Sequence, residues 1–223
     1  MYAQLVQTDV LRRINPHGAL AQSRAHGPLA KWITGVPIKF GPNREIYGEK
    51  EPADYVYELA HGAVRTVKVL PDGRRQIGGF YFAGNIFGLE DGREHSFSAE
   101  AITISNVRVI KRSTLTRMAR DDREFAEQLM TVTAQEIARL HNHALMLIKT
   151  APERLGSFLL EMAERISLGG VIELPMSRQD IADYLGITIE TVSRTFTILE
   201  SQSTIALPNS RAVVLRNAAA LAA

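Results

Sequence analysis

The stretch SRQDIADYLGITIETVSR, residues 177–194, decides the fold of the carboxyl-terminal part of the chain. Ser177, followed three residues later by Asp180, is typical of a capping box at the start of a helix. Gly186 suits the left-handed conformation that ends a helix, and Thr188 can cap the next one. Two short helices joined by a short turn that contains glycine form a helix-turn-helix, which the sequence therefore predicts here.

Two apolar runs follow the motif, at residues 204–207 and 212–215, on either side of Pro208-Asn209-Ser210. Short apolar runs around such turn residues are typical of a β-hairpin, so we expect a wing beside the two helices. We place a winged helix-turn-helix at residues 150–217 and a tail at residues 218–223.

The second helix of the motif has an outward face that can read bases. Ile189, Glu190, Ser193 and Arg194 lie opposite its apolar positions, on the turns where a recognition helix reaches base edges. Arginine can donate two hydrogen bonds to guanine, and glutamate can accept one from cytosine. The alternative is an ordinary surface ion pair between Glu190 and Arg194. The flanking helix, turn and wing favour base reading.

Helix starts can also hold phosphates, because their backbone N–H groups point outward. The candidates for phosphate contact are Ser177, Arg178, Gln179, Thr188 and Thr191. Residues 171–223 carry four basic and five acidic side chains, so the usual basic footprint of a DNA-binding domain is weak. DNA binding is predicted from the arrangement of these residues rather than from their charge.

Residues 121–149 contain no glycine or proline and have apolar positions at helical spacing. One stripe alternates steps of three and four residues: Met130, Thr133, Ile137, Leu140, Ala144 and Leu147. A second stripe, Phe125, Leu129 and Val132, lies on another face and can cover a neighbouring domain. The first stripe is either buried within its own subunit or lies between two subunits. Two stripes on one long helix favour the second reading, a dimerisation helix at residues 120–149.

Residues 36–116 consist of short apolar or alternating runs separated by turn residues, for example at 41–43, 71–73 and 90–92. Many short strands with regular turns predict a sandwich or small barrel, and the missing helical patterns argue against a parallel sheet. We expect an antiparallel β-roll at residues 28–119, preceded by a loosely held lead-in at residues 1–27. The fold class is α+β.

Composition indicates an intracellular globular protein: 223 residues, a net charge of +2, 45% apolar and 22% charged residues. No apolar run reaches the roughly 18 residues that a membrane span needs, and the start lacks the apolar core of a secretory signal. We expect a cytoplasmic protein without membrane contact. The chain has no cysteine, which excludes disulfides, cysteine-bound iron–sulfur clusters and thiolate zinc sites.

Residues 177–194 resemble the DNA-binding motif of the CRP/FNR superfamily of bacterial transcription regulators, and the Glu190-x-x-Ser193-Arg194 form is similar to that of its FNR/FixK branch. The stretches that resemble the β-roll of FixK-type members are GPNREIYG (41–48), GRRQIGGF (73–80) and GNIFGLE (84–90). The likeness covers about residues 37–217. It implies a jelly roll of the cyclic-nucleotide-binding type, a long dimerisation helix and a winged helix-turn-helix.

This resemblance also implies a homodimer that grips a twofold DNA site and acts with RNA polymerase as a transcription activator. The half-site of the FNR/FixK branch is TTGAT, spaced as TTGAT-N4-ATCAA. Arg194 and Glu190 would read its central G·C pair, and Ser193 the neighbouring T·A step. Ile189 matches a position where cAMP-receptor relatives carry arginine, which favours TTGAT over TGTGA. Thr195 departs from the family pattern, in which an apolar residue is usual.

The resemblance predicts no cofactor and no metal. FNR proper holds its iron–sulfur cluster through cysteines, which this chain lacks. The cAMP receptor grips phosphate with an Arg-Ser pair, where this chain has His95-Ser96-Phe97-Ser98. This is the FixK pattern, in which expression, turnover or modification sets activity. A small-molecule- or haem-gated regulator with an occupied β-roll pocket is the alternative.

An enzyme is the competing class, because β-rolls can also host metals. Such a site needs two or three histidines and a carboxylate that converge from paired strands. The strand region offers only His61 and His95, so we expect no catalytic residues. A purely structural dimer would leave the outward patch of the second helix without a purpose.

Overall fold

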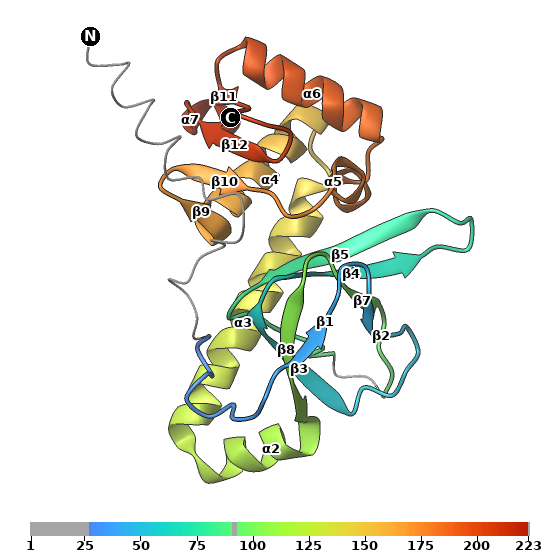
Figure 1. The fold of residues 1–223 in the computed structure, drawn as a ribbon, viewed down its shortest axis with the longest axis vertical. Helices are drawn as coiled ribbons and strands as arrows, with labels where there is room; N and C mark the ends of the chain where they lie inside the picture. The colour runs from blue at the N-terminus through green and yellow to red at the C-terminus, as the bar shows by residue number, and fades with distance from the viewer. Residues whose placement is uncertain (1–26, 91–92, 223) are drawn as a thin grey trace.

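The computed structural model describes residues 27–90 and 93–222. Residues 1–26 of the expected lead-in and residues 91–92 of an expected turn lie outside this described part. Figure 1 shows a β-roll, a long helix that runs along it, and a smaller domain at the carboxyl end that sits above the β-roll. No helix among the described residues combines the length and the apolar character that crossing a bilayer requires.

The β-roll consists of two antiparallel sheets. Its strands are β1 (Ile38–Phe40), β2 (Glu45–Tyr47), β3 (Tyr55–His61), β4 (Ala63–Val69), β5 (Arg75–Phe82), β6 (Ile86–Phe87), β7 (Ser98–Ala101) and β8 (Ser105–Lys111). They pair in the orders β1-β8-β3-β6 and β2-β7-β4-β5. Leu59, Val64 and Val107 are fully buried between the sheets. The predicted antiparallel β-roll is confirmed.

Helix α2 (Arg112–Asp121) follows β8 directly, where the strand pattern was expected to continue to about residue 116. Its apolar face consists only of Leu115, Met118 and Ala119, which pack with Phe125 at the start of the next helix. Fewer than three turns with three apolar positions are too short for a helical period to stand out from a strand pattern. The expected strand ending was therefore wrong.

Helix α3 (Arg123–Met146) is the long helix expected at residues 120–149. Its start is capped by Asp122, whose carboxylate accepts from the Phe125 backbone N–H at 3.0 Å and from the Trp32 indole N–H at 2.8 Å. Phe125 and Val132 are buried against the β-roll, and Leu129 is partly buried beside them. The second predicted stripe thus covers a neighbouring domain, as expected.

The carboxyl-terminal domain begins with α4 (Ala151–Ile166). Glu153 closes the start of this helix, because its carboxylate accepts from the Thr150 backbone N–H at 2.8 Å and from the Thr150 hydroxyl at 2.6 Å. Pro152 lies in the first turn, where its missing N–H costs no helical hydrogen bond. Pro152 predicts from the sequence that the long helix breaks here and that a new helix starts, and the structure confirms both.

The remaining elements form the winged helix-turn-helix. They are β9 (Ser167–Leu168), β10 (Val171–Glu173), α5 (Arg178–Leu185), α6 (Ile189–Ser201), β11 (Ile205–Ala206), β12 (Ala212–Leu215) and α7 (Ala219–Ala222). The four strands pair in the order β11-β12-β10-β9. Asn209 holds the turn of the wing, since its side-chain oxygen accepts from the N–H groups of Arg211 and Ala212, both at 2.8 Å. The predicted hairpin wing is confirmed.

Two details of this domain differ from expectation. In the sequence, Gly169-Gly170 predicts the end of the helix that begins near Pro152. In the structure, α4 ends at Ile166, and Gly169 and Gly170, with φ of 60° and 82°, form the turn between β9 and β10 instead. The expected tail includes α7, whose Leu221 is buried. Gly156 permits this approach, because a methyl group there would lie 2.8 Å from the Leu221 carbonyl oxygen.

The two parts of the molecule meet at the β4–β5 hairpin. Phe80 of β5 packs against Tyr184 of α5, with ring centroids 5.1 Å apart, and against Phe158 of α4 at 6.2 Å. These residues belong to one apolar cluster that continues into the core of the helix-turn-helix. Burial of these apolar side chains favours contact between the β-roll and the carboxyl-terminal domain. The hydrophobic effect is non-directional, however, so it does not fix the angle between them.

Candidate DNA interface

The helix-turn-helix is built by local hydrogen bonds at its helix ends. Ser177 Oγ accepts from the Asp180 N–H at 3.0 Å, and Asp180 Oδ2 accepts in return from the Ser177 N–H at 3.0 Å. Gly186 adopts the left-handed conformation, with φ of 64° and ψ of 37°. Thr188 Oγ1 then accepts from the Thr191 N–H at 3.2 Å at the start of α6. The predicted capping box, glycine turn and second cap are confirmed.

Gly186→Ala should lower the free energy of unfolding by about 1–2 kcal/mol, because a Cβ strains the left-handed backbone. Space is not the cause, since the added methyl would meet only Arg154 Nη1 at 3.5 Å and Leu147 Cδ2 at 3.8 Å. Urea denaturation measures the change. Gly186→Asn is the control and should cost less, because asparagine tolerates this conformation better. A larger cost for asparagine would assign the effect to crowding.

Helix α6 divides into a buried face and an exposed face. Val192, Phe196 and Leu199 are buried against the rest of the domain. Of the four predicted base-reading residues, Glu190, Ser193 and Arg194 are exposed, whereas Ile189 is half-buried and packs partly against the core. In Figure 1, α6 lies at the end of the molecule furthest from the β-roll. Its outward face is therefore open to a partner as large as a DNA duplex.

The charged pair on this face is not held in an ion pair. Among the described residues, no salt bridge joins Glu190 to Arg194, although the charge of Arg194 contributes to the lowered pKa of Glu190. The pKa of Glu190 lies below its usual value, chiefly because of hydrogen bonds with its own backbone N–H and with the Thr188 hydroxyl. A carboxylate that can accept hydrogen bonds and a guanidinium that can donate them are thus both exposed on this face of α6.

Thr195, the departure from the family pattern, is accommodated on the buried face of α6. Its side chain is buried, and its hydroxyl donates to the Thr191 carbonyl one turn earlier at 2.8 Å. A buried hydroxyl with a partner avoids the cost of an unsatisfied polar group. The apolar packing of α6 against α5 is therefore retained.

The predicted phosphate-binding residues gather at the starts of α5 and α6. Ser177, Gln179 and Thr188 are exposed, and Thr191 is half-buried. Arg178 instead lies against the wing: its guanidinium stacks 3.2 Å from the Phe196 ring centroid, and Nη2 donates to the Ser210 carbonyl at 3.4 Å. Burial lowers its pKa to about 10, so it remains a cation at neutral pH. Reaching a phosphate would require Arg178 to leave this ring.

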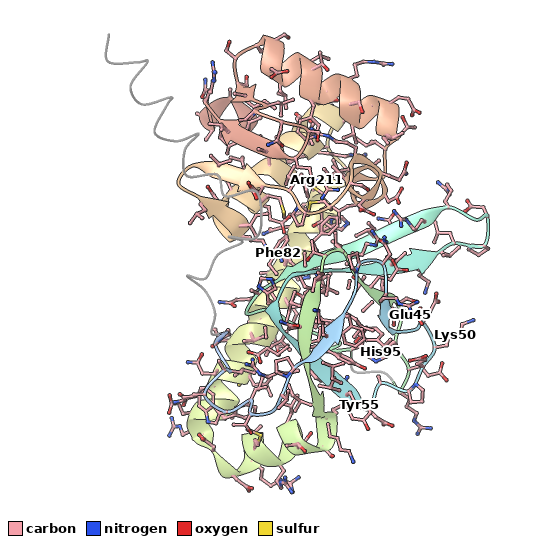
Figure 2. The ribbon with its side chains drawn as sticks, in the orientation of Figure 1. Glu45, Lys50, Tyr55, Phe82, His95 and Arg211 are labelled. Carbon is pink, nitrogen blue, oxygen red and sulfur yellow. The ribbon has the colours of Figure 1, made fainter. Side chains whose placement is uncertain are left out.

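Aromatic rings and a carboxylate fill the β-roll interior around His95. His95, at the position of the phosphate-holding arginine in the cAMP receptor, lies inside the β-roll (Figure 2) and stacks on Tyr47 with ring centroids 3.7 Å apart. Its Nδ1 is 3.3 Å from the Glu90 carboxylate, a group that repels a phosphate. Tyr57 and Phe87 fill the neighbouring space between the sheets. Aromatic rings and the Glu90 carboxylate thus occupy the position at which a bound phosphate group would need a cation.

The first stripe of α3 faces away from its own subunit. Met130 is 74%, Ile137 49% and Leu140 47% exposed. Thr133 and Ala144 are exposed as well, whereas Leu147 is half-buried beside Gly186. The alternative of a stripe buried within its own subunit is therefore wrong.

Two further residues belong to the exposed apolar surface of this segment and were missed. Leu145 is 60% and Ile148 82% exposed. A step of four from Ala144 leads to Ile148, and a step of three leads to Leu147. An α-helix has 3.6 residues per turn, so a step of three or of four residues stays near the same face. The sequence was therefore compatible with either Leu147 or Ile148 as the next residue of the stripe. The contact with the helix-turn-helix decides that Leu147 turns inward.

Comparisons with known proteins match this arrangement. Residues 37–122 match the family model of the cyclic nucleotide-binding domain, and residues 153–223 match that of the Crp-like helix-turn-helix domain. A nitrogen fixation regulation protein FixK from Azorhizobium caulinodans is 47% identical over 92% of this chain and 85% of its own length. A transcriptional activator protein Anr from Pseudomonas protegens is 32% identical over 81% of this chain and 76% of its own length. The solved structure of FixK2 from Bradyrhizobium japonicum is 47% identical, with a TM-score of 0.80 over 84% of this chain and 96% of that chain.

Proposed function

We propose the mode of DNA recognition of this chain from the premise that it belongs to the CRP/FNR family of transcription regulators, close to the FixK proteins. Its relatives include transcriptional activators, and it carries the Crp-like helix-turn-helix domain. The chain binds as a homodimer to a palindromic site of the form TTGAT-N4-ATCAA. Bound there, it recruits RNA polymerase and activates transcription.

The exposed triplet of Glu190, Ser193 and Arg194 on α6 is the observation that carries this proposal. Arg194 donates two hydrogen bonds to O6 and N7 of the guanine in TTGAT, and Glu190 accepts from N4 of the paired cytosine. Ser193 contacts the neighbouring T·A step. A carboxylate facing DNA is repelled by phosphates unless it meets a base donor, so Glu190 supports base reading over a purely electrostatic contact.

The exposed stripe of α3 supports the homodimer. Burying a large apolar side chain such as Met130, Ile137 or Leu140 contributes about 1.5–3 kcal/mol relative to leaving it in water. A twofold axis along this helix gives two reading helices related by the same symmetry as a palindromic site, about one helical turn apart. The half-sites of TTGAT-N4-ATCAA have this relation.

Selection from a random DNA pool tests the proposal. The purified chain should enrich sequences with two inverted TTGAT half-sites separated by four base pairs. A template carrying the enriched site upstream of a promoter should then yield more transcript with bacterial RNA polymerase when the protein is added. Retention of DNA without any preferred sequence, at low as well as moderate salt, would contradict base reading by α6.

A further inference from the structure

A buried cluster of ion pairs joins the β-roll to α5. Arg65 of β4 donates through Nη1 to both carboxylate oxygens of Asp180, at 3.0 and 3.1 Å. Arg75 of β5 donates through Nη2 to Asp180 at 2.7 Å and through Nε to Asp183 at 2.7 Å. Arg65 also holds Glu100 of β7 through two contacts, at 2.7 and 3.0 Å. Two guanidinium groups of the β-roll thus bind two carboxylates of α5 across the junction, and one of the two groups also binds Glu100 within the β-roll.

Asp180 links this cluster to the start of the DNA-binding motif. Its Oδ2 also accepts from the Ser177 N–H at 3.0 Å and from the Ser177 hydroxyl at 2.8 Å, so one carboxylate both caps α5 and holds two arginines. Asp180 is 2% and Arg65 8% exposed. In Figure 1, α5 rests directly over the β4–β5 hairpin from which both arginines come.

Such a cluster of ion pairs can fix the orientation of α5 relative to the β4–β5 hairpin. Removing two charges from water offsets most of their attraction, so a buried ion pair contributes little net stability compared with apolar contacts. Guanidinium–carboxylate contacts are directional, however, and fix the angle between the elements that carry them. The apolar contact of Phe80 with Tyr184 beside the cluster brings the hairpin and α5 together. The ion pairs then restrict how they are oriented.

The cluster also bears on the excess of acidic over basic side chains in the DNA-binding domain. Asp180 and Asp183 are two of the five acidic residues in residues 171–223, and the arginines that neutralise them lie outside that segment, in the β-roll. If the hairpin moved away, Asp180 and Asp183 would lose the arginines that neutralise them, and α5 would carry two uncompensated negative charges. Phosphates approaching that helix start would then be repelled.

We propose that Arg65 and Arg75 are positioning residues for DNA binding. They hold α5 on the β4–β5 hairpin, which fixes the separation and orientation of the two reading helices in a dimer. The same contacts neutralise Asp180 and Asp183, which face the hairpin. The inference rests on the proposed palindrome binding, and it assigns the β-roll a part in that binding without any contact to DNA.

Arg75→Gln is the test variant, because Arg75 is partly exposed and Arg65 remains to hold Asp180. Arg74→Gln is its matched control: it removes the same charge from the neighbouring residue, which among the described residues forms an ion pair only with Asp72 of the same hairpin. Dissociation constants are measured on palindromes with spacers of three, four and five base pairs. Wild type and Arg74→Gln should bind the palindrome with one spacer length more tightly than the other two.

Arg75→Gln should lose about tenfold affinity on the preferred spacer, the scale of one broken interaction between neighbouring groups. Its affinities for the three spacers should also become more alike. Arg75→Lys keeps the charge but cannot span both carboxylates, so it should fall between wild type and Arg75→Gln. A uniform loss on all three spacers would contradict positioning, since a residue that only stabilises the fold does not alter spacer preference.

Asp183→Asn completes a double-mutant cycle with Arg75→Gln. If Arg75 acts through Asp183, its loss should be smaller in the Asp183→Asn background. If Arg75 binds a phosphate directly, the loss should be the same in both backgrounds, which would overturn the inference. Failure of the wild-type chain to bind any palindrome would overturn the proposed function itself. Normal wild-type binding, with Arg75→Gln equal to Arg74→Gln, would overturn only the positioning role.

Discussion

Arg194→Ala should weaken binding to TTGAT-N4-ATCAA by about 1–3 kcal/mol per half-site, because each subunit loses a bidentate contact with guanine. Arg194 is exposed and holds no carboxylate among the described residues, so its removal should leave the fold intact. The two half-sites are well separated, and their losses should add approximately. Titration of labelled duplexes at a fixed salt concentration measures the change.

The decisive readout is discrimination at the central G·C pair. Wild type should bind a duplex with A·T at this position much more weakly, whereas Arg194→Ala should bind both duplexes alike. Arg216→Ala is the control, since it removes the same charge from an exposed position at the end of β12. It should weaken all sequences equally, if it weakens them at all. A uniform loss for Arg194→Ala would make Arg194 a phosphate contact.

The features that sequence predicted well are those encoded within a few residues. Ser177 and Asp180 form their capping box three residues apart, and Gly186 ends α5 through its own backbone conformation. Such signals are read locally because the partners that satisfy each other are neighbours in the chain. The outward face of α6 follows from its buried face, since the period of a helix fixes both.

The features that sequence could not predict depend on distant contacts. Arg65 and Asp180 are 115 positions apart, and nothing in the pattern around either residue marks it as buried or paired. Isolated charges normally indicate a solvated surface. Arg178 illustrates the same limit within the site: its position next to a helix start indicated a phosphate contact. The Phe196 ring, which becomes its neighbour only in the folded domain, holds its guanidinium by stacking.

Ile137→Glu combined with Leu140→Glu should convert the proposed dimer to monomers, the largest effect that we expect. Both side chains are about half exposed in the isolated subunit, at 49% and 47%, so the subunit should still fold. In a dimer, each would be replaced by a carboxylate that the opposing helix would bury without a partner, and such a buried charge is costly. Sedimentation velocity measures the change in mass, and far-ultraviolet circular dichroism confirms that the helices remain.

DNA binding by the same double variant shows how dimerisation contributes to recognition by α6. A dimer that engages one half-site holds its second reading helix near the other, which raises palindrome affinity far above half-site affinity. The double variant should therefore bind a single TTGAT half-site as wild type does and lose the palindrome advantage. Thr131→Glu with Gln135→Glu is the control, because it adds the same charges at exposed positions of α3 outside the stripe. A double variant that sediments as wild type does would place the subunit interface elsewhere.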